Sequence, residues 1–192
     1  MFLYNDLGDK NMRIVGGKYR SRLIKFPLDA KVTRPTKDMV REGLFNALGE
    51  DINDAVVLDL FAGSGALGLE SLSRGAKFVY FVDTSNLAIK VIKDNLISLK
   101  EIDNAELLNK DYYEALIELK DREIKFNIVF LDPPYKKMVI AEIIDFLFAN
   151  NILSPNGIII IETDYHLDLI DKRFKKIKEY KYGKTFITIK RS

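Results

Sequence analysis

The sequence predicts an α/β fold, in which helices cover both faces of a mostly parallel β-sheet. Short runs rich in β-branched and aromatic residues alternate with longer segments whose apolar residues recur every three or four positions. This alternation of strand and helix implies right-handed crossovers between parallel strands. With 192 residues, 47% of them hydrophobic, the chain is long enough to bury the core of one such domain.

Seven segments have the composition of strands. The first five are separated by segments long enough for crossover connections, so we expect them to be parallel. The last two follow each other closely around Gly183, so we expect a hairpin that adds an antiparallel last strand to the sheet. The expected strands are 56–61, 77–82, 105–108, 126–131, 157–162, 174–181 and 185–190.

Helices are predicted where apolar residues recur at helical spacing. Two of them lie between strands, with apolar stripes from Leu87 to Leu99 and from Ile140 to Phe148. A third is expected over 37–48, ahead of the sheet. Thr36 has the side chain of an N-cap for this helix, and Gly49 is a typical residue to end it.

Positive charge is concentrated near the N-terminus. Residues 12–41 contain nine Lys or Arg and two Asp, although the whole chain has a net charge of only +2. A basic segment attached to a mildly acidic body indicates contact with a polyanion such as nucleic acid, although a solvated basic loop would have the same composition. We expect 12–26, which alternates charged and apolar residues, to form a small hairpin or strand arm.

The composition excludes several kinds of chemistry. The chain has no cysteine and one histidine, so disulfides, cysteine-ligated zinc and thiol nucleophiles are ruled out, and we expect no metal. The absence of cysteine is typical of a reducing compartment, so we expect a cytoplasmic location. The longest aliphatic run, Ile158–Ile161, is far too short to span a membrane, and we expect no membrane association.

The glycine-rich turn after the first strand predicts a nucleotide-binding site. Gly63, Gly65 and Gly68 match the G-x-G-x-x-G pattern between a buried strand and a helix. Asp83 follows at the end of the second strand, where its carboxylate would accept hydrogen bonds from ribose hydroxyls. The pattern fits a dinucleotide as well as S-adenosylmethionine, but Asp59 would repel a pyrophosphate and attract a cationic cofactor. The sequence therefore favours S-adenosylmethionine.

Two further polar residues follow strands. Asp111 comes just after the third strand, where it would bind the adenine amine of the cofactor, cap the next helix, or do both. His166 comes after the fifth strand at an expected helix start, and we interpret it as a structural or surface residue.

The Asp132-Pro133-Pro134-Tyr135 sequence follows the fourth strand and predicts an amine methylation site. The exocyclic amine of a base is a poor nucleophile because its lone pair is delocalised into the ring. Acceptors aimed at the amine hydrogens, here the Asp132 carboxylate and the Pro133 carbonyl, would localise that lone pair toward a methyl donor. The prolines stiffen the loop, and Tyr135 offers a ring on which an extruded base would stack.

These motifs resemble a known family. Residues 59–68 and 132–135 are similar to the motifs of class I S-adenosylmethionine-dependent amino-methyltransferases. Residues 12–20, 33–36 and 40–42 resemble one family among them, the bacterial 16S rRNA guanine-N2 methyltransferases of the RsmD type. The similarity extends from Met12 to the end of the chain.

The resemblance implies a seven-stranded sheet of order 3-2-1-4-5-7-6, a methyltransferase domain over 37–192 and an RNA-binding arm over 12–36. The substrate would be a flipped-out guanine of 16S rRNA, within the small subunit or an assembly intermediate, and the enzyme a monomer. The expected cofactor-binding residues are Asp59, Phe61, Ala62, Gly63, Ser64, Gly65, Gly68, Asp83 and Asp111. The expected RNA-binding residues are Arg13, Lys18, Arg20, Arg22, Arg34, Thr36 and Arg41.

Two features depart from the family pattern. Family members often have an acid two residues after the ribose-binding one, whereas this chain has Ser85 two residues after Asp83. Residues 1–11 precede the start of the pattern, and we expect this tail to be dispensable.

Other functions would use part of the same sequence. A DNA amino-methyltransferase acting on adenine N6 or cytosine N4 would share the chemistry of 132–135, but such enzymes usually have an insertion that reads base edges. A non-catalytic RNA-binding module would need the basic arm but not Asp132. An NAD-dependent oxidoreductase would leave 132–135 unexplained.

Overall fold

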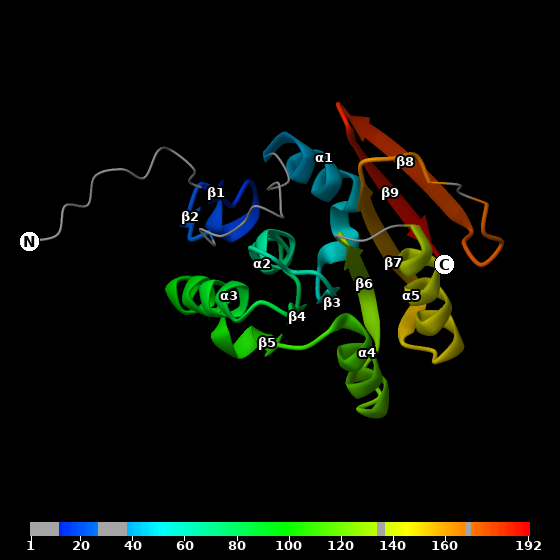
Figure 1. Ribbon diagram of the computed structural model, residues 1–192. Coiled ribbons are helices and arrows are strands. Elements are labelled where there is room, and N and C mark those ends of the chain that lie inside the picture. The colour runs from blue at the N-terminus through cyan, green and yellow to red at the C-terminus, as the bar shows by residue number, and fades with distance from the viewer. Residues whose placement is uncertain (1–11, 27–37, 134–136, 168–169) are drawn as a thin grey trace, which may run out of the picture.

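A computed structural model describes residues 12–26, 38–133, 137–167 and 170–192. At its centre is a seven-stranded sheet of order β5-β4-β3-β6-β7-β9-β8, with helices on both faces (Figure 1). The pairs from β5 to β7 are parallel, and β9 is antiparallel to both of its neighbours. The strands are β3 (Val56–Asp59), β4 (Phe78–Val82), β5 (Ala105–Leu108), β6 (Phe126–Leu131), β7 (Leu153–Thr163), β8 (Lys176–Tyr182) and β9 (Thr185–Arg191).

This topology confirms the expected α/β fold with an antiparallel last strand, and the strand order is the one that the resemblance implied. The strand boundaries differ in places. β3 ends at Asp59 rather than Phe61, because the chain turns there into the glycine-rich segment. β7 begins at Leu153 rather than Gly157, and the register between β6 and β7 shifts before Ile128, which accommodates the longer strand.

Side chains that alternate along the strands build two apolar layers, one on each face of the sheet. The layer that contains Val57 is covered by α1, α2, α3 and the arm. The layer that contains Leu58 is covered by α4 and α5. The helices are α1 (Asp38–Leu48), α2 (Ala66–Ser73), α3 (Asn86–Leu99), α4 (Tyr112–Asp121) and α5 (Lys137–Ala149), with short 3-10 helices η1 (Gly17–Tyr19), η2 (Gly49–Ile52) and η3 (Ile102–Asn104).

The helix expected over 37–48 is present as α1 and ends at Gly49, whose φ of +57° suits glycine. Its expected cap, Thr36, and the N-terminal tail 1–11 lie outside the described residues. The helix expected to begin near His166 is absent from the described part of that segment, where the chain bends instead.

The basic arm is a small hairpin, as expected. β1 (Met12–Arg13) pairs antiparallel with β2 (Leu23–Ile24), and η1 lies between them. The arm lies beside α2 and α3 (Figure 1), and polar side chains of α2 hold it. The Ser73 hydroxyl donates to the Gly16 carbonyl at 2.6 Å and accepts from the Tyr19 amide at 3.0 Å. The buried Glu70 carboxylate accepts from the Val15 amide at 2.8 Å.

A second set of contacts fixes the arm to α3 and the turn after it. The Asn95 side chain pairs with both backbone groups of Lys25, at 2.8 and 3.0 Å. Buried Glu101 accepts a hydrogen bond from the Tyr19 hydroxyl at 2.5 Å and pairs with Lys18 at 2.5 Å. Because these partners are buried or half-buried, losing one would leave a polar group without a partner. The arm is therefore a fixed part of the domain.

Replacing Gly68 by alanine is expected to lower the free energy of unfolding by about 1 to 3 kcal/mol, because the new methyl group would overpack the core. An ideal Cβ on Gly68 would lie 2.1 Å from a carbon of the buried Phe81 ring. At an uncrowded helical position the same change would stabilise the protein by about 0.5 to 1 kcal/mol. The direction of the change in the free energy of unfolding therefore shows whether Gly68 is crowded. Chemical denaturation measures it, and adding Phe81→Leu should recover part of the loss. A more stable Gly68→Ala protein would contradict this packing.

Candidate active site at the carboxyl edge of the sheet

The glycine-rich turn links the end of β3 to the start of α2. Gly63 and Gly65 have φ values of +51° and +74°, in the left-handed region where other residues are strained. The turn is held by hydrogen bonds from the Ala62 amide to the Val82 carbonyl at 2.9 Å and from the Gly65 amide to the Ala62 carbonyl at 2.6 Å. It therefore forms a tight, preorganised loop at the carboxyl edge of the sheet.

Asp59 is the last residue of β3 and is only 3% exposed. Its Oδ2 accepts a hydrogen bond from the Gly68 amide at 3.0 Å, which ties the strand to the first turn of α2. The pKa of Asp59 is raised to about 7, mainly by burial, which outweighs the lowering effect of that hydrogen bond, and in addition by the Asp83 carboxylate. A cation placed beside Asp59 would favour its ionised form and be bound by it.

Asp83 connects the end of β4 to the glycine-rich turn. Its Oδ2 accepts from the Gly63 amide at 2.7 Å, and its Oδ1 accepts from the Ser85 amide at 2.8 Å. Each carboxylate oxygen has a further lone pair, so a ribose hydroxyl could still donate to it. Ser85, at the position where the family often has an acid, caps α3 by accepting from the Ala88 amide at 3.2 Å.

Asp111 is the N-cap of α4, which is one of its two expected roles. Its Oδ1 accepts from the Tyr113 amide at 2.9 Å, and the side chain is exposed at the end of β5. Its contact with an adenine amine stays a prediction. The ring centroid of the next residue, Tyr112, lies 5.5 Å from that of Phe61. An aromatic pair therefore lies beside Asp111, at the carboxyl edge of the sheet. Tyr112 directly follows Asp111 in the chain and was not among the residues expected at the site.

Asp132 directly follows β6, and β6 pairs with β3, the strand that ends at Asp59. The pKa of Asp132 is raised to about 7, mainly by burial and in addition by the neighbouring carboxylates of Glu162 and Asp59. Pro133 is half-buried beside it, whereas Pro134 and Tyr135 lie outside the described residues. Glu162 was not among the residues expected at the site, although it is an acid at the end of an otherwise aliphatic strand.

The basic residues of the arm differ in how far their charges are already paired. Arg20 and Arg22 are exposed, and their guanidinium groups make no hydrogen bond or ion pair with any other residue that the structure describes. Arg13 pairs with Asp38 at 2.8 Å, and Lys18 pairs with Glu101. The two arginines are therefore the cations of the arm that are most available to a polyanion.

The expectation that Arg41 contacts nucleic acid is wrong in this structure. Arg41 is 1% exposed, and its guanidinium donates to the Arg13 carbonyl at 2.6 Å and to Asp38 Oδ1 at 2.8 Å. It therefore joins the arm to the start of α1 inside the protein. Arg34 and Thr36 lie outside the described residues.

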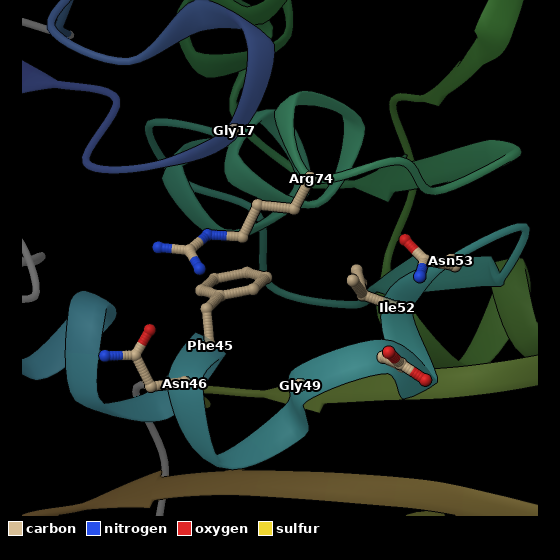
Figure 2. A pocket seen from close by; sticks show the side chains of 8 residues that line it. Gly17, Phe45, Asn46, Gly49, Ile52, Asn53 and Arg74 are labelled. Atoms are coloured by element: carbon tan, nitrogen blue, oxygen red, sulfur yellow. The ribbon is translucent and has the colours of Figure 1, made fainter.

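A pocket of about 510 Å³ lies away from these residues, at the amino ends of β3 and β4 (Figure 2). The Arg74 guanidinium lies over the Phe45 ring at 5.2 Å from its centroid, and its Nε donates to Glu70 at 2.8 Å. No residue expected to bind cofactor or base lines this pocket, so we place the site at the opposite edge. The pocket is lined by Gly17, Phe45, Asn46, Gly49, Glu50, Ile52, Asn53 and Arg74.

The described residues form neither a metal site nor a membrane span. No group of three or more His, Asp or Glu among them is arranged to hold a metal ion. None of the helices in those segments combines the length and the apolar character needed to cross a membrane.

Comparison with known proteins gives consistent matches. A profile of the family described as "Conserved hypothetical protein 95" matches residues 12–191. The Ribosomal RNA small subunit methyltransferase D of Escherichia coli strain K12 is 39% identical over 160 residues, 83% of this chain and 78% of the relative. The protein of that name from Haemophilus influenzae is 40% identical over 161 residues, 83% of this chain and 82% of the relative.

A solved structure matches in the same way. The putative methyltransferase yhhF from Escherichia coli superposes with a TM-score of 0.83 and 34% identity, over 94% of this chain and 97% of that one. The chain therefore belongs to the family described as "Conserved hypothetical protein 95", in agreement with its resemblance to enzymes of the RsmD type.

Proposed function

We propose that this protein methylates the exocyclic N2 amine of a guanine in 16S rRNA, with S-adenosylmethionine as the methyl donor. The observation that carries the proposal is the position of Asp132. It follows β6 at the same sheet edge as the glycine-rich turn, beside buried Asp59. The relatives named as ribosomal RNA small subunit methyltransferases support the choice of substrate.

The residues around the glycine-rich turn suit S-adenosylmethionine. This cofactor supplies an electrophilic methyl group on a sulfonium. Asp59 is a buried carboxylate whose ionised form needs a cation nearby, and the amino group and sulfonium of the cofactor meet that need. Asp83 retains lone pairs for the ribose, and Asp111 is exposed where the adenine amine would lie. The amides at the start of α2 and the side chain of Phe61 would complete the contacts.

Asp132 and Pro133 would prepare the target amine. The Asp132 carboxylate and the Pro133 carbonyl would each accept a hydrogen bond from one of the two amine hydrogens, so that the nitrogen lone pair would point toward the methyl carbon. The N–C bond forms as the C–S bond breaks, and the departing proton passes to Asp132 or to water. Positioning supplies most of the rate enhancement in such a reaction. Tyr135 is proposed to stack on the flipped-out base.

Arg20 and Arg22 are proposed to contact the RNA backbone. Further RNA contacts are proposed for Arg13, Lys18, Arg34 and Thr36. A small arm suffices where the shape of a folded RNA supplies most of the recognition. We therefore propose that the substrate is 16S rRNA within the small subunit or one of its assembly intermediates. The protein would act there as a cytoplasmic monomer.

Binding of S-adenosylmethionine at pH 6 is expected to release close to one proton, because Asp59, with a pKa of about 7, is mostly protonated before the cation arrives. Calorimetry in two buffers of different ionisation enthalpy measures the release. Asp59→Asn should abolish it and weaken binding at least about tenfold, which corresponds to about 1.4 kcal/mol. Asp132→Asn is the control, because Asp132 has a similar pKa but is assigned to the base. Release that persists in Asp59→Asn would remove Asp59 from the cofactor site.

Transfer of labelled methyl groups tests the proposed function directly. The substrates are small subunits from cells that lack the enzyme, protein-free rRNA and duplex DNA. We expect N2-methylguanosine from the subunits or the rRNA, with kcat/KM rising as the pH increases toward 7 because the ionised Asp132 is the acceptor. Asp132→Asn should lower kcat by about 10²-fold or more while cofactor affinity is kept.

Label found only in adenine or cytosine of DNA would overturn the proposed substrate and leave the role of Asp132 in place. An Asp132→Asn enzyme with normal kcat would overturn the role of Asp132.

Replacing Arg20 and Arg22 together by alanine is expected to weaken RNA binding and to reduce the slope of log K against log salt by about 1.4 to 1.8, since each phosphate contact contributes about 0.7 to 0.9. Binding measured at several salt concentrations gives the slope. Lys77→Ala with Lys125→Ala is the matched control, because it removes two exposed positive charges at the amino edge of the sheet. An equal effect of both double variants would mean that the arm has no special role.

A further inference from the structure

Three adjacent parallel strands each present a carboxylate at the carboxyl edge of the sheet. Asp59 ends β3, Asp132 follows β6, and Glu162 is the last residue but one of β7. Leu131 of β6 pairs with Ile161 of β7, so Asp132 and Glu162 are the next residues along two paired strands. Glu162 is thus the nearest acidic neighbour of Asp132 across the sheet.

Asp132 and Glu162 also continue the same face of the sheet. Phe130 and Ile160, two residues before them, both pack in the apolar layer under α1 and α2. Since side chains alternate along a strand, Asp132 and Glu162 follow on that face. In keeping with this placement, the Glu162 carboxylate raises the pKa of Asp132. On the other side of Glu162, the paired residue of β9 is apolar Ile187.

Asp132 and Glu162 therefore present two hydrogen-bond acceptors next to each other at the carboxyl edge of the sheet. The carboxylates of Glu162 and Asp59 both disfavour ionisation of Asp132, so a ligand that donates hydrogen bonds here would favour the charged form of Asp132. The arrangement suits a ligand with two neighbouring hydrogen-bond donors.

Guanine offers such donors side by side. Its N2 amine is flanked by the N1–H donor, whereas the N6 amine of adenine is flanked by the N1 lone pair and the N4 amine of cytosine by the N3 lone pair. A carboxylate beside the amine acceptor would bind the N1–H of guanine. The same carboxylate would repel the ring nitrogen of adenine or cytosine.

We propose that Glu162 determines the specificity of this site for guanine, by accepting a hydrogen bond from N1–H while Asp132 accepts from the N2 amine. This inference rests on the proposed function and deepens it, because it assigns the choice between guanine and the bases of DNA amino-methyltransferases to one side chain. Glu162 is a specificity residue, and the methyl transfer itself still depends on Asp132.

The test replaces the target guanine of the RNA substrate by 2-aminopurine, which keeps the 2-amine but has a lone pair in place of N1–H. Wild-type protein is expected to prefer guanine by about 10-fold or more in kcat/KM, in the range of one well-formed base contact. In Glu162→Gln the amide can donate to the ring nitrogen, so the preference should fall below about 3-fold. Cofactor affinity should be unchanged in the variant.

Glu179→Gln is the matched control, because Glu179 of β8 contacts His166 on the opposite face of the sheet. It should keep the wild-type preference. Equal methylation of guanine and 2-aminopurine by wild-type protein would overturn the inference, even if the variant did not fold. A Glu162→Gln protein that prefers guanine over 2-aminopurine as strongly as the wild type would also overturn it. Failure of the wild-type protein to methylate guanine N2 in any RNA would instead overturn the proposed function.

Discussion

The parallel pairing of β3, β6 and β7 is the constraint on which the candidate site depends. Parallel strands in register end at the same edge of the sheet, so strand pairing alone brings the first residues beyond each strand close together. Asp59 pairs opposite Phe130, and Leu131 pairs opposite Ile161. A shift of one residue in either pairing would move a carboxylate to the other face of the sheet. The chemistry therefore depends on backbone hydrogen bonds within the core.

The same arrangement lowers the stability of the folded protein as the pH rises toward neutral. Asp59 and Asp132 have raised pKa values in the folded state, near 7, so the folded chain keeps protons that the unfolded chain loses above about pH 4. Their contribution to the free energy of unfolding consequently falls as the pH rises from about 4 to about 7. Such a loss is typical of residues selected for binding or catalysis rather than for stability.

Much of the fold and part of the site could be predicted from the sequence. Strand and helix periodicity predicted the α/β class, and the spacing of the glycines after a buried strand located the turn next to Asp59. Charge alone could not show that Arg41 is buried against a carbonyl, because burial depends on how the arm packs on α1. Glu162 was overlooked for a related reason, since its proximity to Asp132 follows from strand register rather than from spacing along the chain.

The way the arm is attached limits how this protein can be re-engineered. Its hairpin is held by side chains of the domain, above all Glu70 and Ser73 of α2 and Glu101 after α3. Met12 accepts a weak hydrogen bond from Ser64 in the glycine-rich turn, at 3.8 Å. A hairpin transplanted from another enzyme would therefore have to form the same hydrogen bonds with these side chains before it could redirect the protein to a different RNA.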